Sequence, residues 1–277
     1  MAEGCVQSEV VSLPEMSQTQ AEEVLEMFAE GEGLESVNTS LALHLVDLAR
    51  DLGRDALVAR LLDHAAKVSL NPEDQGWCQF ELLKHNGATK DELIGLGMTS
   101  EDEELHGLAA GIFHHVSLLS LGSEDAGVFA NRSMRLRELA EDLEGMIYGH
   151  ALIAHIAKEE GDFEKSQLHL QKRLDIIPES ESFERMEGLA DLAHSHSTLG
   201  ELEQAQELLI QSLTIATEIQ DLSGILVARW GLADLAEISN QPDEAMVQLS
   251  DIMTVFMEAG EVVPEPVRER VSKLTAE

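Results

Sequence analysis

The chain is predicted to fold as an all-α solenoid, a stack of antiparallel helix pairs, and three observations lead to this prediction. A pattern of apolar and small residues recurs three times at a spacing of about 39–40 residues. Glycine, proline and capping residues fall between the periodic segments, where helices end and begin. No stretch alternates β-branched with polar residues between hairpin signals, and aromatic residues make up only 4% of the chain, so strands are not expected.

The recurring pattern is a pair of positions followed by two more at fixed offsets. Each copy begins with an apolar and a small residue, has another small residue thirteen positions later, and has a leucine four positions after that. The copies comprise Ile153, Ala154, Ser166 and Leu170; Leu192, Ala193, Ala205 and Leu209; and Leu232, Ala233, Ala245 and Leu249. Small side chains let two antiparallel helices cross closely, while large ones pack against the next pair, so each copy predicts one helix pair of a repeat array.

Turn residues extend the array towards the N-terminus. Gly161, Gly200 and Asn240 occupy the expected inter-helix turns of the three copies. Earlier glycines at 122, 87 and 53 step back from Gly161 by 39, 35 and 34 residues. Residues 36–70 are therefore expected to form an early repeat, residues 73–98 a truncated unit with a short second helix near 91–96, and the copy around Gly122 a degenerate one.

Capping signals predict where several helices begin. Ser17 with Gln20, and Ser100 with Glu103, have capping-box spacing. The segments 71–74 and 241–244 each place a proline at the first turn with acidic residues behind it, which suits a helix N-terminus. Pro264 precedes a last amphipathic segment, residues 265–274, that is expected to cap the stack.

The repeat resembles the tetratricopeptide repeat, whose pattern is W-x2-L-G-x2-Y, then A-x3-F, then P. In the clearest copy five of these positions are filled, by Leu189, Leu192, Ala193, Ala205 and Leu209. The chain departs from the family where aromatic residues are common, since it has Ala157, His196 and Ala236 there. The spacing exceeds 34 residues, as in the long-helix variant of kinesin light chains. The resemblance is good over residues 145–260 and implies a right-handed superhelix of antiparallel helix pairs.

This pattern gives a domain organisation. Residues 1–15 are expected to be a disordered lead-in, residues 16–262 a single array of tetratricopeptide-like repeats, and residues 263–277 a C-terminal capping helix. No glycine-, serine- or proline-rich linker interrupts the array.

The charge balance excludes one class of partner. The chain has 53 acidic and 18 basic residues, for a formal net charge of −35, and the acidic residues are spread evenly along it. Binding a phosphate backbone requires clustered Lys and Arg, so a nucleic-acid partner is not expected. The acidity favours a partner with a basic or amphipathic segment; the alternative is general surface acidity, as in a protein from a salt-tolerant organism.

The sequence predicts a cytoplasmic protein. No apolar run of about 18 residues is present, so no membrane span is expected. The first residues lack the basic and apolar regions of a secretory signal. Two cysteines, Cys5 and Cys78, do not make a disulfide framework.

The resemblance also implies where a partner binds, because the first helix of each pair lines the concave groove in this family. The corresponding positions are Tyr148, Ala151 and His155, then Glu187, Ala190 and His194, then Val227, Trp230 and Asp234, with Glu237 nearby. The two aromatic residues are candidate hot spots of a peptide-binding groove, since Tyr and Trp provide large contact areas. The alternative is that Tyr148 and Trp230 pack between helices.

No catalytic, cofactor or metal site is expected. Phosphate-binding glycine loops and nucleophile motifs are absent, and none of the eleven histidines has metal-ligand spacing. Histidines of the core or the groove are the favoured interpretation. One basic cluster, Arg132, Arg135 and Arg137, either docks an acidic partner or pairs with nearby acids such as Asp142.

Two functions from different classes remain. The first is a non-catalytic scaffold or adaptor that binds a peptide or protein segment in the concave groove. The second is a self-assembling structural protein whose ends stack into homo-oligomers. A polar final helix, with Arg268, Glu269, Arg270 and Lys273, favours the first because it opposes end-to-end stacking.

Overall fold

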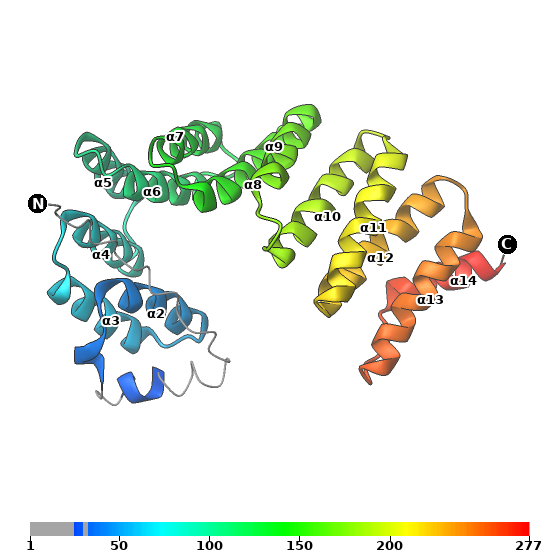
Figure 1. Ribbon diagram of the computed structural model, residues 1–277, viewed down its shortest axis with the longest axis horizontal. Helices are drawn as coiled ribbons and strands as arrows, with labels where there is room; N and C mark the ends of the chain where they lie inside the picture. The colour runs from blue at the N-terminus through cyan, green and yellow to red at the C-terminus, as the bar shows by residue number, and fades with distance from the viewer. Residues whose placement is uncertain (1–24, 30–32, 277) are drawn as a thin grey trace, which may run out of the picture. The chain divides into compact units, whose positions relative to one another are not determined.

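The computed structural model describes residues 25–29 and 33–276, and helices joined by turns and short irregular segments make up this part of the chain (Figure 1). No strand occurs in the described part of the chain, so the predicted all-α class is confirmed. The expected lead-in, residues 1–15, and the capping box of Ser17 and Gln20 lie outside the described residues.

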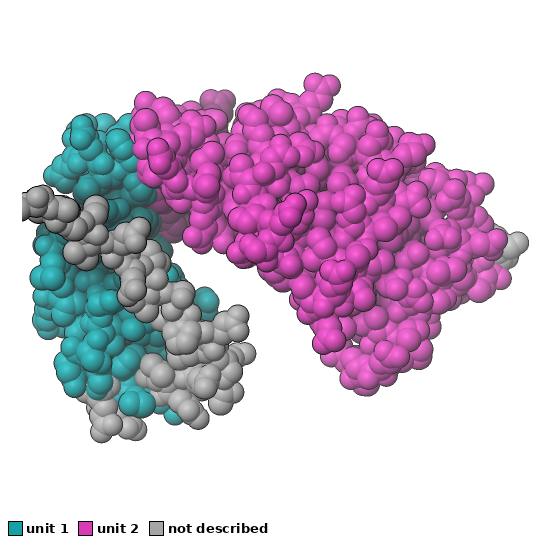
Figure 2. All heavy atoms as spheres, viewed as in Figure 1, with its two compact units in different colours: residues 1–108 teal, residues 109–277 magenta. Residues whose placement is uncertain are grey.

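The chain divides into two compact units, residues 1–108 and 109–277 (Figure 2). The single array over residues 16–262 stays a prediction.

Unit 1 is a succession of short helices, each packed on the next. They are a 3-10 helix η1 (Leu34–Ser36) and the α-helices α2 (Thr39–Asp51), α3 (Asp55–Val68), α4 (Pro72–His85) and α5 (Lys90–Asp102). Gly53 and Gly87 adopt positive φ angles of 66° and 70° in the turns, which glycine tolerates without strain. The core of unit 1 is a cluster of buried leucine, valine and alanine side chains from α2 and α3, joined by Cys78 of α4.

Unit 2 is a longer succession of helix pairs. Its helices are α6 (His106–Leu118, in this unit from Ala109), α7 (Asp125–Leu139), α8 (Leu143–Glu159), α9 (Phe163–Ile176), α10 (Ser182–Thr198), α11 (Leu202–Glu218), α12 (Leu222–Ile238), α13 (Pro242–Glu258) and α14 (Glu265–Ala276). The pairs α8/α9, α10/α11 and α12/α13 correspond to the three copies of the sequence pattern, and Figure 1 shows their helices packed side by side.

The small residues of the pattern lie where the helices of a pair cross. Ala193 of α10 and Ala205 of α11 are both 0% exposed and belong to one core cluster with Leu209. Gly161 and Gly200 make the turns within their pairs with φ of 79°, and Asn240 does so with φ of 55°. The repeat pattern therefore predicted both the helix pairs and their turns.

Helix caps confirm one prediction and correct another. Asn71 caps α4 by accepting a hydrogen bond from the backbone N–H of Asp74 at 2.8 Å. Ser100 does not start a helix: it is buried inside α5, and its hydroxyl donates to the carbonyl of Leu96 at 3.0 Å. The capping box belongs instead to Thr89 and Glu92 at the start of α5, which is longer than the expected short helix near 91–96.

The last helix, α14, packs on the final pair. Its Val267 is fully buried in a cluster with Ala233 of α12 and with Leu249 and Ile252 of α13. Arg268, Glu269 and Lys273 of α14 are exposed. The outer face of this helix is therefore polar, as expected for the end of a repeat array.

Candidate functional site

The predicted groove positions lie on the first helices of three pairs in unit 2, where they border two neighbouring hollows. The first hollow lies between α8 and α10 and is bordered by Ala151, His155 and His194. The second lies between α10 and α12 and is bordered by Glu187, Ala190 and Val227. Asp191 of α10 borders both hollows, so the two are adjacent along the same helices.

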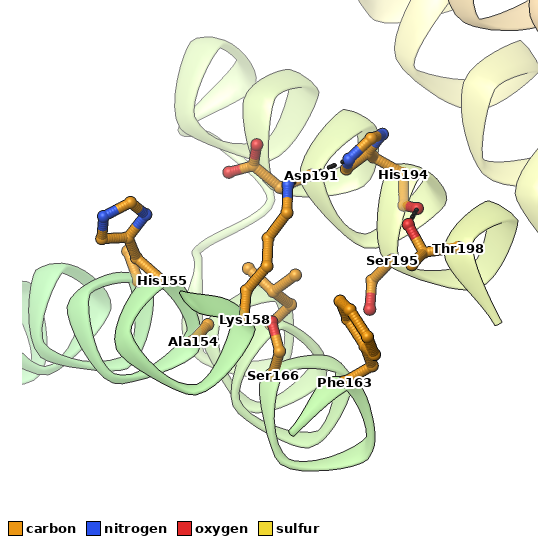
Figure 3. A pocket seen from close by; sticks show the side chains of 11 residues that line it. Ala154, His155, Lys158, Phe163, Ser166, Asp191, His194, Ser195 and Thr198 are labelled. Carbon is orange, nitrogen blue, oxygen red and sulfur yellow. Dashed lines mark hydrogen bonds between the residues drawn. The ribbon is translucent and has the colours of Figure 1, made fainter. Parts of the chain in front are cut away.

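The first hollow, of about 220 Å³, has an apolar side and a polar side (Figure 3). Phe163 and Leu170 of α9, with Ala154 of α8, supply the apolar side. Polar side chains of α8 and α10 supply the rest, and Figure 3 shows His155 and His194 on the two opposite helices. The hollow thus offers an apolar surface beside several hydrogen-bonding groups, as sites for small ligands or side chains commonly do.

Lys158 joins the two helices across the first hollow. Its Nζ donates to Nε2 of His194 at 3.0 Å, between α8 and α10. Burial lowers the pKa of His194, and the Lys158 ammonium lowers it further, so the ring is neutral near pH 7 and can accept this hydrogen bond. His155 is half exposed at the other edge, 3.7 Å from the Glu159 carboxylate.

The second hollow, of about 280 Å³, is lined by apolar and acidic side chains. Phe183 and Met186 of α10 contribute apolar surface. Arg173 of α9, almost fully buried, directs its guanidinium to Asp191 at 2.6 Å and Glu187 at 3.8 Å. Burial raises the pKa of Glu187, against the opposing effect of Arg173. One guanidinium therefore holds two carboxylates of this hollow in place.

Trp230, Asp234 and Glu237 of α12 do not border either hollow; they surround Arg270 of α14. The Arg270 guanidinium lies 4.9 Å from the centroid of the Trp230 ring. Its Nη2 is 2.8 Å from Asp234 Oδ1, and its Nε is 2.9 Å from Glu237 Oε1. Burial raises the pKa of Asp234, while Arg270 acts in the opposite direction. These three predicted groove residues thus make contacts within the chain.

Tyr148 is 52% exposed on α8 and borders neither hollow. The structure therefore brings His155 and His194 to one hollow and Glu187 to the next, but it does not bring the two aromatic residues, Tyr148 and Trp230, together. Trp230 instead packs between helices, beside the buried cluster around Val267.

Sequence reasoning missed three residues that line the hollows, Phe163, Lys158 and Asp191. It also missed Arg173, which pairs with Asp191. Phe163 and Arg173 lie on the second helix of a pair, whereas the repeat resemblance implies groove residues on the first helices. Lys158 lies three positions, about one helical turn, after His155, so helical spacing alone could have placed it on the same helix face. Its contact with His194 joins residues 36 positions apart, and no local pattern predicts such a contact.

Other candidate clusters turn out to be structural. Arg137 of the predicted basic cluster is buried and pairs with Asp142 at 3.2 Å, the second of the two interpretations, and Arg132 lies 4.2 Å from the centroid of the Phe113 ring. His150 is buried with its Nδ1 3.0 Å from Nδ1 of His169. Burial, followed by His169 and Lys172, lowers the pKa of His150 to about 4. Among the described residues, no three His, Cys, Asp or Glu side chains are placed to hold a metal ion.

Comparison with known proteins identifies the fold class. No protein-family model and no curated protein matches the sequence. Solved structures do match. The apo form of RapI has a TM-score of 0.56 at 15% identity, covering 87% of this chain and 71% of that chain. The apo form of the quorum sensor NprR from B. thuringiensis has a TM-score of 0.56 at 15% identity, covering 93% and 74%.

A third match is the Rap protein complexed with Competence and Sporulation Factor, with a TM-score of 0.55 at 12% identity, covering 92% of this chain and 80% of that chain. These are proteins of tetratricopeptide-like repeats, so the repeat resemblance seen in the sequence is confirmed at the level of the fold. Within the described residues no helix is long and apolar enough to cross a membrane.

Proposed function

We propose that this chain is a non-catalytic scaffold or adaptor that binds a peptide or protein segment in the groove of unit 2. The groove is defined here as the two adjacent hollows along α8, α10 and α12. The observation that carries the proposal is their shared border at Asp191, which makes one path from His155 to Val227. Apolar pockets beside fixed hydrogen-bonding groups suit the side chains of an extended or helical segment.

Two further features support a peptide ligand. The groove side chains are already held in place, His194 by Lys158 and Asp191 by Arg173, so little side-chain entropy is lost on binding. A solved structure of the same fold contains Competence and Sporulation Factor bound to a Rap protein. The acidic side chains of the groove, Glu187 and Asp191, favour a ligand that carries basic residues.

The other expectations become part of this proposal: no cofactor, no metal, no nucleic-acid or membrane partner, and a cytoplasmic location. Self-assembly into homo-oligomers is the alternative function. The exposed Arg268, Glu269 and Lys273 of α14 favour the scaffold over end-to-end stacking.

A peptide library tests the groove directly. Twelve-residue peptides are selected on the full chain and then measured against two variants. Ala190→Trp fills the second hollow, and Gln211→Trp places the same side chain on the exposed face of α11. The selected peptides should bind the wild type and Gln211→Trp equally, and Ala190→Trp at least about tenfold more weakly, a loss of about 1.4 kcal/mol. Equal binding to all three proteins, or no enriched peptide, would contradict the proposal.

A further inference from the structure

Unit 1 has its own hollow, of about 410 Å³, between the first helices α2 and α4. Its border is an indole ring with four carboxylates around it. The residues concerned are Leu43 and Asp47 of α2, and Glu73, Asp74, Trp77 and Glu81 of α4. On α4 the acids lie three or four positions before or after Trp77, so they share its helix face.

The charges of this hollow are only partly neutralised by the protein itself. Arg50 pairs with Asp47 at 2.7 Å and with Glu81 at 2.9 Å, and Lys84 pairs with Glu81 at 2.7 Å. No Lys or Arg among the described residues forms an ion pair with Glu73 or Asp74. Asp74 Oδ2 accepts a hydrogen bond from the side-chain amide of Asn71 at 2.9 Å, which does not neutralise its charge. Two negative charges beside a half-buried indole are therefore left without a cationic partner among the described residues.

An independent observation in unit 2 shows what such a combination binds. The chain has two tryptophans, and each is followed four positions later by an acid, Glu81 after Trp77 and Asp234 after Trp230. At Trp230 the occupant is visible: the Arg270 guanidinium lies against the ring and contacts two carboxylates. At Trp77 the corresponding acid, Glu81, is already paired with Arg50, but no Lys or Arg of the described residues lies against the indole ring.

We propose that the hollow at Trp77 binds an arginine side chain presented by a partner protein or peptide. A guanidinium is planar, stacks on an indole face, and donates to carboxylates in a fork geometry. It therefore matches the ring and the carboxylates of Glu73 and Asp74, which have no cationic partner among the described residues. The strongly negative chain attracts such a ligand over long range at low salt. This site lies in unit 1 and does not depend on the groove of unit 2.

Nuclear magnetic resonance of the two indole N–H groups provides the test, because each tryptophan gives one signal and Trp230→Phe assigns them. The probe is N-acetyl-arginine amide, a single guanidinium with neutral ends. The matched control probe is N-acetyl-citrulline amide, which has the same shape without the charge. The Trp77 signal should shift saturably with the arginine probe, at most weakly with citrulline, and less as salt is raised.

Two pairs of isosteric substitutions locate the effect. Glu73→Gln with Asp74→Asn removes these two negative charges and should weaken binding of the arginine probe at least about fivefold. Asp102→Asn with Glu103→Gln removes the same charge from two exposed positions at the C-terminal end of α5 and should leave binding unchanged. The Trp230 signal, whose site holds Arg270, should not respond. An unmoved Trp77 signal, equal shifts with citrulline, equal shifts at Trp230, or equal weakening by the two double variants would each overturn the proposal.

Discussion

Replacing Ala205 with leucine tests the close helix crossing in unit 2. Ala205 is fully buried on α11 against Ala193 and Leu209, so the three added carbon atoms of leucine have no space at native packing density. Overpacking of this kind typically destabilises by about 1–3 kcal/mol. Unit 2 spans about 170 residues, so an unfolding entropy of about 2.1 cal/mol/K per residue converts this loss into a fall in Tm of roughly 3–8 °C.

Differential scanning calorimetry measures this fall. The control is Gln204→Leu, which introduces the same side chain at the neighbouring, exposed position of α11 and should stay within about 0.5 kcal/mol of the wild type. If Ala205→Leu and Gln204→Leu melt within a degree of each other, the close crossing at Ala205 is wrong.

Three further predictions concern the contacts described above. Arg270→Gln should destabilise the C-terminal pair by about 1–3 kcal/mol, because a charged hydrogen bond is lost. In a protein whose single tryptophan is Trp230, the same substitution should shift the fluorescence emission to the red. Unchanged emission would contradict the contact between Arg270 and Trp230. The pKa of His150 is about 4 in the folded chain, below its ordinary value of 6.5, so the unfolded chain takes up the proton first and stability is lost as pH falls from 6.5 to 4. In urea unfolding, His150→Gln should therefore lose less stability than the wild type over this pH range. An unchanged pH dependence in the variant would refute this. Gly145→Ala should destabilise by about 1–3 kcal/mol because the new Cβ overlaps the partly buried ion pair of Arg137 and Asp142. Gly95→Ala, with nothing within 4 Å of the new Cβ, should instead stabilise by about 0.5–1 kcal/mol. Equal changes in the urea midpoint would count against the packing at Gly145.

The sequence predicted the helix pairs because their determinants are local and periodic. Ala193 and Ala205, which meet at a crossing, are only twelve positions apart in the chain. Gly161 and Gly200 make turns that require positive φ. Such signals can be recognised from a short stretch of sequence, without knowledge of the rest of the chain. The false capping box of Ser100 and Glu103 shows the limit of a short motif. Its spacing was right, but Ser100 lies inside a helix that begins at Lys90, and Glu103 follows the end of that helix.

The candidate site was predicted less completely. Helical spacing shows on which face of a helix a residue lies, but not which other part of the chain packs against that face. Trp230 and Asp234 do share a face of α12, as predicted, yet α14 brings Arg270 against them from 36 or more positions away. His194 was placed on the groove face, but its partner Lys158 belongs to the previous pair. Contacts between pairs depend on tertiary packing, which the repeat pattern does not specify in detail.

The groove of unit 2 is the central claim, and the site of a photo-crosslink tests it most directly. A benzophenone amino acid is placed at Val227, which borders the second hollow, or at the exposed Ser250 of α13 as a control, and each protein is irradiated with a library-selected peptide. If the peptide binds in the groove, it should be crosslinked to position 227 and not to position 250. Capture from position 250, or from both positions alike, would contradict it.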